Sequence, residues 1–314
     1  MHQYLRAIGF SEVRDRRSLH KIIGDAVQDA DRRVYTSLTQ KEQPAGGDQT
    51  QGDPLLAQFE RDFGSGIGLA ICGELDETDH FIYDFYYPYL RGTGVSTAEE
   101  VSIERHAAQD SYAGVCDELR VGVTMIFYLQ NRITWLRAVE DGRFPSAEIT
   151  VTLSALSLSG MIMMPIAKTS EQREDLRRKA VGRNQVIAAA RGGDEDAIET
   201  LTLYDMDMYT ALTRKARTED IYTLVDTCFM PYGVECDQYS VIGEILDFRR
   251  TTNFLTREHV IVMRLNCNDL LFDVAINEKD LYGEPAVGRR FKGNIWMQGF
   301  LNFPTEPSVI DISL

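Results

Sequence analysis

The sequence predicts an α+β protein that is rich in β structure. Apolar and polar residues alternate over many short stretches, which is typical of half-buried strands. Only a few stretches repeat with the period of a helix. With 314 residues, of which 44% are hydrophobic and 26% charged, the chain has an ordinary globular composition. Its length suits two domains, or one large domain with an embellishment.

The order of the predicted elements divides the chain into three parts. Residues 1–167 are expected to form a β-rich α+β domain, residues 168–218 a helical hairpin, and residues 219–314 a small antiparallel β domain. Five strands of the length predicted in the last part are enough to curl into a small barrel of the OB type. Packing as a plain sheet against the helical hairpin is the alternative, and the sequence leaves both open.

The first part begins with a predicted strand over residues 4–10 and a helix that Ser18 can cap, with its apolar residues on one face. Residues 39–53 contain three glycines and no large apolar residue, and they predict a mobile loop. Residues 56–63 suit either a helix or a strand. The other predicted elements are strands at 33–38, 67–75, 81–90, 101–104 and 120–129, a helix at 133–139, and a buried hairpin of 148–156 and 160–166.

The middle part changes character. Ser170 can cap a charged helical stretch that Gly192 and Gly193 interrupt, and a second stretch continues from Asp194 to about residue 217. The last part returns to strands, which are predicted at 221–229, 239–248, 260–265, 270–276 and 291–303, with hairpin-turn residues at 266–269.

The last predicted strand has two different faces. Its odd positions are apolar, whereas Arg290, Lys292, Asn294, Trp296 and Gln298 line up on the even face. This face is the best ligand-binding candidate, because a tryptophan platform beside hydrogen-bond donors resembles the faces that nucleic-acid-binding barrels use. The same residues could instead pack against another layer. Exposure of Trp296 would indicate a site and burial a packed face, and the packed face is favoured.

The aromatic residues of 81–90 also alternate. Phe81, Tyr83, Phe85, Tyr87 and Tyr89 are predicted to point to one side of a strand. Stacked rings could bind a sugar, a base or a peptide, but a place in the core or in a subunit interface is favoured.

A weaker candidate site lies between residues 104 and 118. Glu104 and His106 would share a strand face, and Cys116 follows, so a carboxylate, a base and a nucleophile are close in the sequence. A hydrolytic enzyme is therefore an alternative function, although a buried and unreactive cysteine is commoner. The histidines show no metal-binding pair such as His-Glu-x-x-His, and we expect no metal and no cofactor.

The formal net charge of −15 opposes binding to nucleic-acid phosphates and to anionic membranes. Single-strand nucleic-acid binding by the last part is a further alternative, but nucleic acid is not the expected partner. Five dispersed cysteines and an N-terminus without a secretory signal indicate reduced thiols and a cytoplasmic protein. No apolar run approaches the roughly 20 residues that span a bilayer.

Four segments carry a resemblance to a known family: LRAIGF at 5–10, YAGVC at 112–116, FMPYGVECD at 229–237 and GEPAVGRRFKGNIW at 283–296. Over most of its length the chain resembles an uncharacterised family of bacterial hypothetical proteins, found mainly in anaerobic gram-positive bacteria. The resemblance implies no activity, ligand or catalytic residue. We therefore expect a cytoplasmic, non-enzymatic binding or scaffold protein, acting through a protein partner, a second copy of itself or a small ligand.

Overall fold

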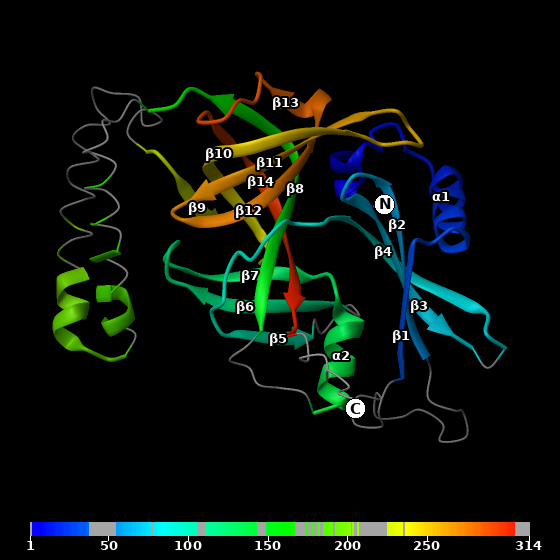
Figure 1. Ribbon diagram of the computed structural model, residues 1–314, viewed down its shortest axis with the longest axis horizontal. Coiled ribbons are helices and arrows are strands. Elements are labelled where there is room, and N and C mark those ends of the chain that lie inside the picture. Colours follow the sequence, from blue (N-terminus) through cyan, green and yellow to red (C-terminus); the bar gives the residue numbers. More distant parts are fainter. Residues whose placement is uncertain are drawn as a thin grey trace, which may run out of the picture.

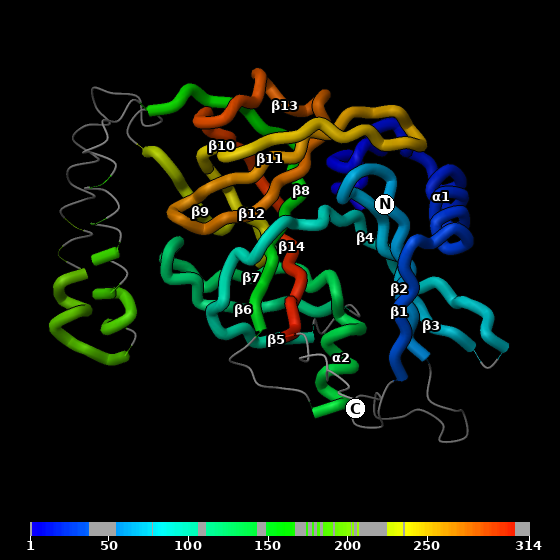
Figure 2. The backbone as a smooth tube through the Cα atoms, in the orientation of Figure 1, coloured from blue at the N-terminus to red at the C-terminus, as the bar shows by residue number. Residues whose placement is uncertain are grey.

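The computed structural model describes residues 2–37, 55–76, 78–105, 111–142, 149–166, 225–234 and 236–304, and the positions 174, 178, 181–182, 185–190, 192–201, 203 and 206 between them. Within these residues the protein has the predicted β-rich α+β fold, with two sheets and short helices (Figures 1 and 2). The predicted loop at 39–53 lies outside the described residues.

The first sheet has four antiparallel strands in sequence order. They are β1 (Arg32–Ser37), β2 (Leu55–Gly64), β3 (Ile67–Leu75) and β4 (Phe81–Leu90). The β3 and β4 strands form the predicted hairpin. Residues 56–63, which suited a helix or a strand, belong to β2, because β1 and β3 pair with it on both edges.

Helix α1 (Arg16–Gln28) lies beside this sheet and buries Leu19, Ile23 and Ala26 (Figure 1). The helix begins after Asp15 rather than at Ser18. The carboxylate of Asp15 accepts a hydrogen bond of 2.8 Å from the backbone N–H of Ser18, as expected of an N-cap residue.

The predicted strand at 4–10 is wrong. Residues Gln3–Ile8 form a 3-10 helix, η1, that ends at Gly9 with φ of +91°. Tyr4, Leu5, Ala7 and Ile8 are all buried, so the apolar run carries no strand or helix period. A left-handed glycine is a common end for a helical turn.

Five strands of the second sheet pair in a closed ring. β8 pairs with β12, β12 with β11, β11 with β10, β10 with β14, and β14 with β8. Their bounds are β8 (Thr150–Met163), β10 (Gln238–Thr252), β11 (His259–Cys267), β12 (Leu270–Asn277) and β14 (Arg290–Asn302). The β8–β12 pair is parallel, and without β8 the strands of 219–314 leave the ring open. The OB-type barrel predicted for that part alone is not confirmed.

Further strands extend the ring. β7 (Val123–Leu129) pairs with the end of β14. β6 (Tyr112–Glu118) pairs with β7, and β5 (Val101–Arg105) pairs with β6. The β6 strand was not predicted. The remaining elements are α2 (Arg132–Glu140), β9 (Cys228–Pro231), η3 (Glu278–Asp280) and β13 (Leu281–Tyr282).

The predicted hairpin of 148–156 and 160–166 is also wrong, because β8 runs through it as one strand of 14 residues. Gly160 is not a turn residue. A Cβ atom there would lie 2.3 Å from the Cε2 atom of Phe291, so glycine allows the phenylalanine ring to lie against the strand.

Two hydrophobic cores meet at β14. Phe291, Ile295 and Met297 point into the barrel core, where they pack with residues such as Phe272. Trp296 points the other way, into a second core that includes η1, α1 and the four-stranded sheet. Both faces of the last strand are therefore packed over much of its length.

The second sheet takes strands from both sides of the helical stretch. β5 to β8 precede residue 167, and β9 to β14 follow residue 224. Residues 185–190 and 195–201 are helical on either side of Gly193, which has φ of +86°, and they lie to one side of the sheets (Figure 1). The division into domains at 167 and 218 stays a prediction.

Candidate partner-binding face

The even-numbered residues of β14 share one face, as the sequence predicts. Its pairing with β10 has no register shift from Arg290 to Trp296, so the alternation is kept. The one irregularity lies in β8, which has an extra residue opposite Asn294 and Ile295. The face nevertheless passes through three different environments.

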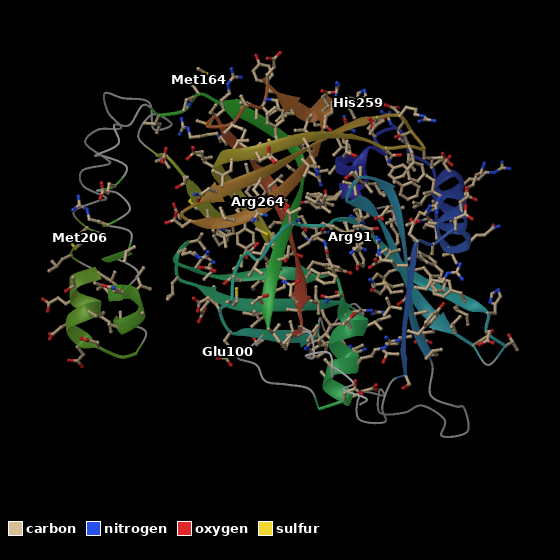
Figure 3. All side chains as sticks on the ribbon, viewed as in Figure 1. Arg91, Glu100, Met164, Met206, His259 and Arg264 are labelled. Carbon is tan, nitrogen blue, oxygen red and sulfur yellow. The ribbon has the colours of Figure 1, made fainter. Side chains whose placement is uncertain are left out.

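At the first end of the face, Arg290 is buried. Its Nε donates to the carbonyl oxygen of Met164 at 3.0 Å, and its Nη1 donates to that of Val225 at 2.8 Å. Burial lowers the pKa of Arg290, and the charge of Asp226 opposes this shift. Met164 and Val225 stand on either side of residues 167–224 in the sequence, and Figure 3 shows Met164 beyond the end of β8. The guanidinium of Arg290 therefore holds the residues before and after this segment close to each other.

At the other end of the face, Trp296 and Gln298 are buried. Trp296 is 5% exposed, stacks on Tyr4 with ring centroids 5.2 Å apart, and donates from Nε1 to Asp237 Oδ2 at 2.7 Å. Gln298 donates from Nε2 to the carbonyl oxygen of Pro88 at 2.8 Å. Burial at this end agrees with the favoured alternative, in which the even face packs against another layer of the protein. The layer that covers Trp296 includes Tyr4 of η1, a segment that the sequence did not assign to this place.

In the middle of the face, Lys292 and Asn294 are half-buried, and register brings exposed apolar side chains beside them. Lys292 pairs with Met161, which pairs in turn with Tyr282. Asn294 lies in the same cross-strand row as Met230 of β9. Met161, Met230 and Tyr282 are 40%, 54% and 77% exposed. We call these five residues the methionine face.

The methionine face has the chemistry of a protein-binding surface. Methionine side chains are flexible and polarizable, and they adapt to varied partners. Lys292 and Asn294 place polar groups between them. Two more exposed apolar residues, Met164 and Val287, lie in the sequence close to Met163 and Arg290, which pair at one end of the β8–β14 ladder. Exposed apolar side chains grouped on one face are a feature of interaction sites.

The sequence signal for this face was incomplete. The even positions of β14 identified Lys292 and Asn294, but Met161, Met230 and Tyr282 were not predicted. The run Gly160-Met-Ile-Met-Met164 was a possible signal, since it ends a buried strand in methionines. Only the register of β8 with β14 and β13 shows that Met161 lies beside Lys292 and Tyr282.

The structure does not bring Glu104 and Cys116 together. Cys116 pairs with Val101 and shares its face, whereas Glu104 is three residues further along β5 and points to the opposite face. Burial, with the charges of Glu118 and Asp117, raises the pKa of Cys116 to about 12. A thiol in this setting is a poor nucleophile. His106 lies outside the described residues.

The aromatic alternation in β4 is broken by a bulge. Tyr83 pairs with Gly73 and Phe85 with Cys72, which leaves Asp84 as an extra residue. Tyr83 therefore points to the opposite side from Phe85, Tyr87 and Tyr89, and the predicted single aromatic face is wrong. Tyr87 and Tyr89 are buried, in agreement with the favoured core interpretation.

Residues 5–299 match one family, described as a domain of unknown function from an E. rectale gene, DUF3881. The chain belongs to the DUF3881 family. The match confirms the resemblance to a bacterial family of unknown function. No curated protein and no solved structure matches the chain.

Two searches of the described residues bear on the type of site. No helix there is long and apolar enough to cross a membrane. No group of three or more His, Cys, Asp or Glu side chains in that part of the chain is placed to hold a metal ion.

Proposed function

We propose that this member of the DUF3881 family is a cytoplasmic, non-enzymatic binding module that holds a protein partner on the methionine face. The observation that supports the proposal is the gathering of Met161, Met230 and Tyr282, all exposed, around Lys292 and Asn294. The five cysteines are free thiols, in keeping with a reducing compartment.

A protein partner fits this face better than a nucleic acid. The tryptophan that could stack on a base is 5% exposed, and the guanidinium of Arg290 is engaged by two backbone carbonyls. The net charge of −15 also disfavours a phosphate backbone. Methionine and tyrosine side chains, by contrast, are enriched in the cores of protein interfaces.

Site-specific photo-crosslinking in an extract of the native host tests the proposal. A photoreactive amino acid at Met161 is expected to give a discrete crosslink to another protein. The same group at Ile82, which is 55% exposed on β4 of the other sheet and so at least as accessible as Met161, is the matched control and is expected to give none.

Substitutions then establish whether the crosslink depends on the face. Tyr282→Asp is expected to weaken it severalfold, because a charge at the interface must be desolvated. Val95→Asp, at an exposed apolar residue outside the face, is expected to leave it unchanged. Equal crosslinking from Met161 and Ile82, or a Met161 crosslink that survives Tyr282→Asp, contradicts the proposal.

A further inference from the structure

The imidazole of His2 lies among three aromatic rings. Its centroid is 4.8 Å from that of Trp296, 6.0 Å from that of Tyr4 and 6.3 Å from that of Tyr86. None of the three rings is stacked parallel on the imidazole, and the interplanar angles are between 43° and 58°. The rings come from η1, β4 and β14, so the tertiary fold assembles the enclosure.

Two of these rings are held in place by other contacts. Trp296 donates from Nε1 to Asp237 and stacks on Tyr4 at an interplanar angle of 25°. Both residues are buried in the second core. The enclosure is therefore largely pre-formed, which reduces the ordering cost of binding.

The side chain of His2 is not fully hydrogen-bonded within this enclosure, as far as the described residues show. Its Nδ1 atom is buried and has no hydrogen-bond partner among the residues that the structure describes, and leaving a buried polar atom unsatisfied is unfavourable. Burial, together with the positive charge of the N-terminus, lowers the pKa of His2 to about 4, so the ring is neutral near pH 7. Its backbone N–H donates to the hydroxyl of Tyr86 at 2.8 Å. Release of the side chain would rehydrate Nδ1 and breaks no side-chain hydrogen bond.

We propose that Trp296, Tyr4 and Tyr86 form an aromatic cage for an organic cation, and that His2 occupies this cage until such a ligand displaces it. The ligand class is a quaternary ammonium group. Cations bind over aromatic faces within about 6 Å of the ring centroid, with tryptophan the strongest partner. A quaternary ammonium group has no N–H, so it needs no hydrogen-bond partner at the position where Nδ1 has none among the described residues.

The carboxylate that contacts Trp296 favours the same ligand. The carboxylate of Asp237 accepts the indole N–H of Trp296, which places a negative charge at the edge of the cage. In the proposed unliganded state, the neutral imidazole of His2 occupies the position that the positively charged head group takes when it binds. This inference does not rest on the methionine face or on a protein partner.

Choline binding tests the cage. The chain has two tryptophans, and Trp135→Phe leaves Trp296 as the only indole, so its fluorescence reports on the cage directly. In this background choline is expected to give a saturable change. His2→Ala is expected to lower the apparent dissociation constant for choline by at least about tenfold. The apparent affinity is proportional to the fraction of molecules in which the cage is open, and the alanine side chain no longer occupies it.

Three comparisons decide the outcome. The neutral isostere of choline, with carbon in place of nitrogen, is expected to bind at least about tenfold more weakly, since it lacks the cation–π attraction. Tyr86→Leu added to His2→Ala is expected to lose the response, whereas Tyr83→Leu, on the other side of the bulge, is expected to keep it. Trimethyl-lysine in place of choline distinguishes a modified protein from a small molecule. No saturable response with His2→Ala, equal binding of the isostere, or full binding with Tyr86→Leu overturns the proposal.

Discussion

Trp296 joins parts of the chain that are far apart in the sequence. It stacks on Tyr4 of η1, lies 5.2 Å from the ring of Tyr128 in β7, and donates a hydrogen bond to Asp237 before β10. Aromatic contacts of this geometry add to the gain from burial. The residue therefore contributes to the attachment of the N-terminal segment to the barrel.

Trp296→Ala is expected to lower the free energy of unfolding by about 3–5 kcal/mol, the usual cost of a large core truncation. Trp296→Phe keeps a ring but leaves Asp237 without the indole donor, and its expected cost is smaller, about 1–3 kcal/mol. Urea unfolding measures both. A loss below 1 kcal/mol for the alanine variant would mean that the indole is not packed as described.

Glu258 is a buried carboxylate that holds the N-terminal segment from the other side. It accepts hydrogen bonds from Ser11 Oγ at 2.5 Å, Asn277 Nδ2 at 2.7 Å and Lys279 Nζ at 2.9 Å. Burial raises the pKa of this carboxyl, but the hydrogen bonds outweigh burial and the pKa lies below its ordinary value of 4.5. The ionised form is therefore the stabilising one.

The stability that Glu258 provides should depend on pH. A carboxyl whose pKa is lower in the folded state stabilises the fold above its unfolded pKa of 4.5, and this contribution disappears as pH falls through the folded pKa. Glu258→Gln is therefore expected to be less stable than the parent near pH 7 and to approach it below the folded pKa. Thermal melting across pH measures the gap. A gap that stays constant or widens with acid would contradict this assignment.

At the scale of elements, glycines set the distance between β7 and its neighbours. The ring of Phe127 lies between Gly114 of β6 and Gly299 of β14. A Cβ atom at these glycines would come within 2.1 Å and 2.2 Å of that ring, respectively. Phe127 is fully buried, so it has no room to move. The odd face of β14 thus includes glycine where a large ring from another strand must fit.

Gly299→Ala is expected to cost about 1–3 kcal/mol through overpacking against Phe127. Phe127→Leu in the same chain should recover part of this loss, so the two changes are expected to be non-additive. Gly24→Ala is the control, because no atom lies within 4 Å of a Cβ there and α1 gains helix propensity. Unfolding free energies of the single and double variants measure the coupling, and strict additivity would argue against the contact.

Arg290 connects the helical stretch to the barrel through the carbonyls of Met164 and Val225. Arg290→Met removes both donors and is expected to cost about 1–3 kcal/mol. Amide hydrogen exchange should increase around residues 161–166 and 225–231, because both ends of the stretch lose their common tie. Arg250→Met, at an exposed arginine on β10, is the control. Unchanged exchange at either end would show that Arg290 does not hold the two ends together.

At the scale of the whole molecule, the ring of β8, β12, β11, β10 and β14 places the first and last parts of the chain in one sheet. The ring closes through the parallel pair of β8 and β12. Arg290 bonds to the carbonyls of both Met164 and Val225, so these two residues lie close together and a short connection can join them.

A chain in which a short Gly-Ser linker replaces residues 168–223 is therefore expected to fold. Residues 219–314 alone are expected to stay unfolded, because they lack β8. Circular dichroism and amide dispersion in NMR spectra measure both. A folded 219–314 fragment would mean that these strands form an independent domain, and an unfolded linker variant would mean that the stretch contributes to the core.

The sequence by itself determined the α+β class and most of the strands, including the hairpin of β3 and β4. The alternation of apolar and polar residues along a strand indicates which side chains are buried, and it can be read from neighbouring positions in the sequence. It also identified the even face of β14, on which Lys292 and Asn294 remain partly accessible.

Only the tertiary structure decided what covers each buried residue. Gly160 had the signal of a turn, yet it lies in a continuous strand because the ring of Phe291 approaches it. The residues after Gln3 had an apolar run without a period, and packing against the barrel selected a 3-10 helix. The methionine face exists only through the register of β8, β9, β13 and β14. Contacts between residues far apart in the sequence, such as Gly160 and Phe291, set these outcomes, and a local pattern cannot encode them.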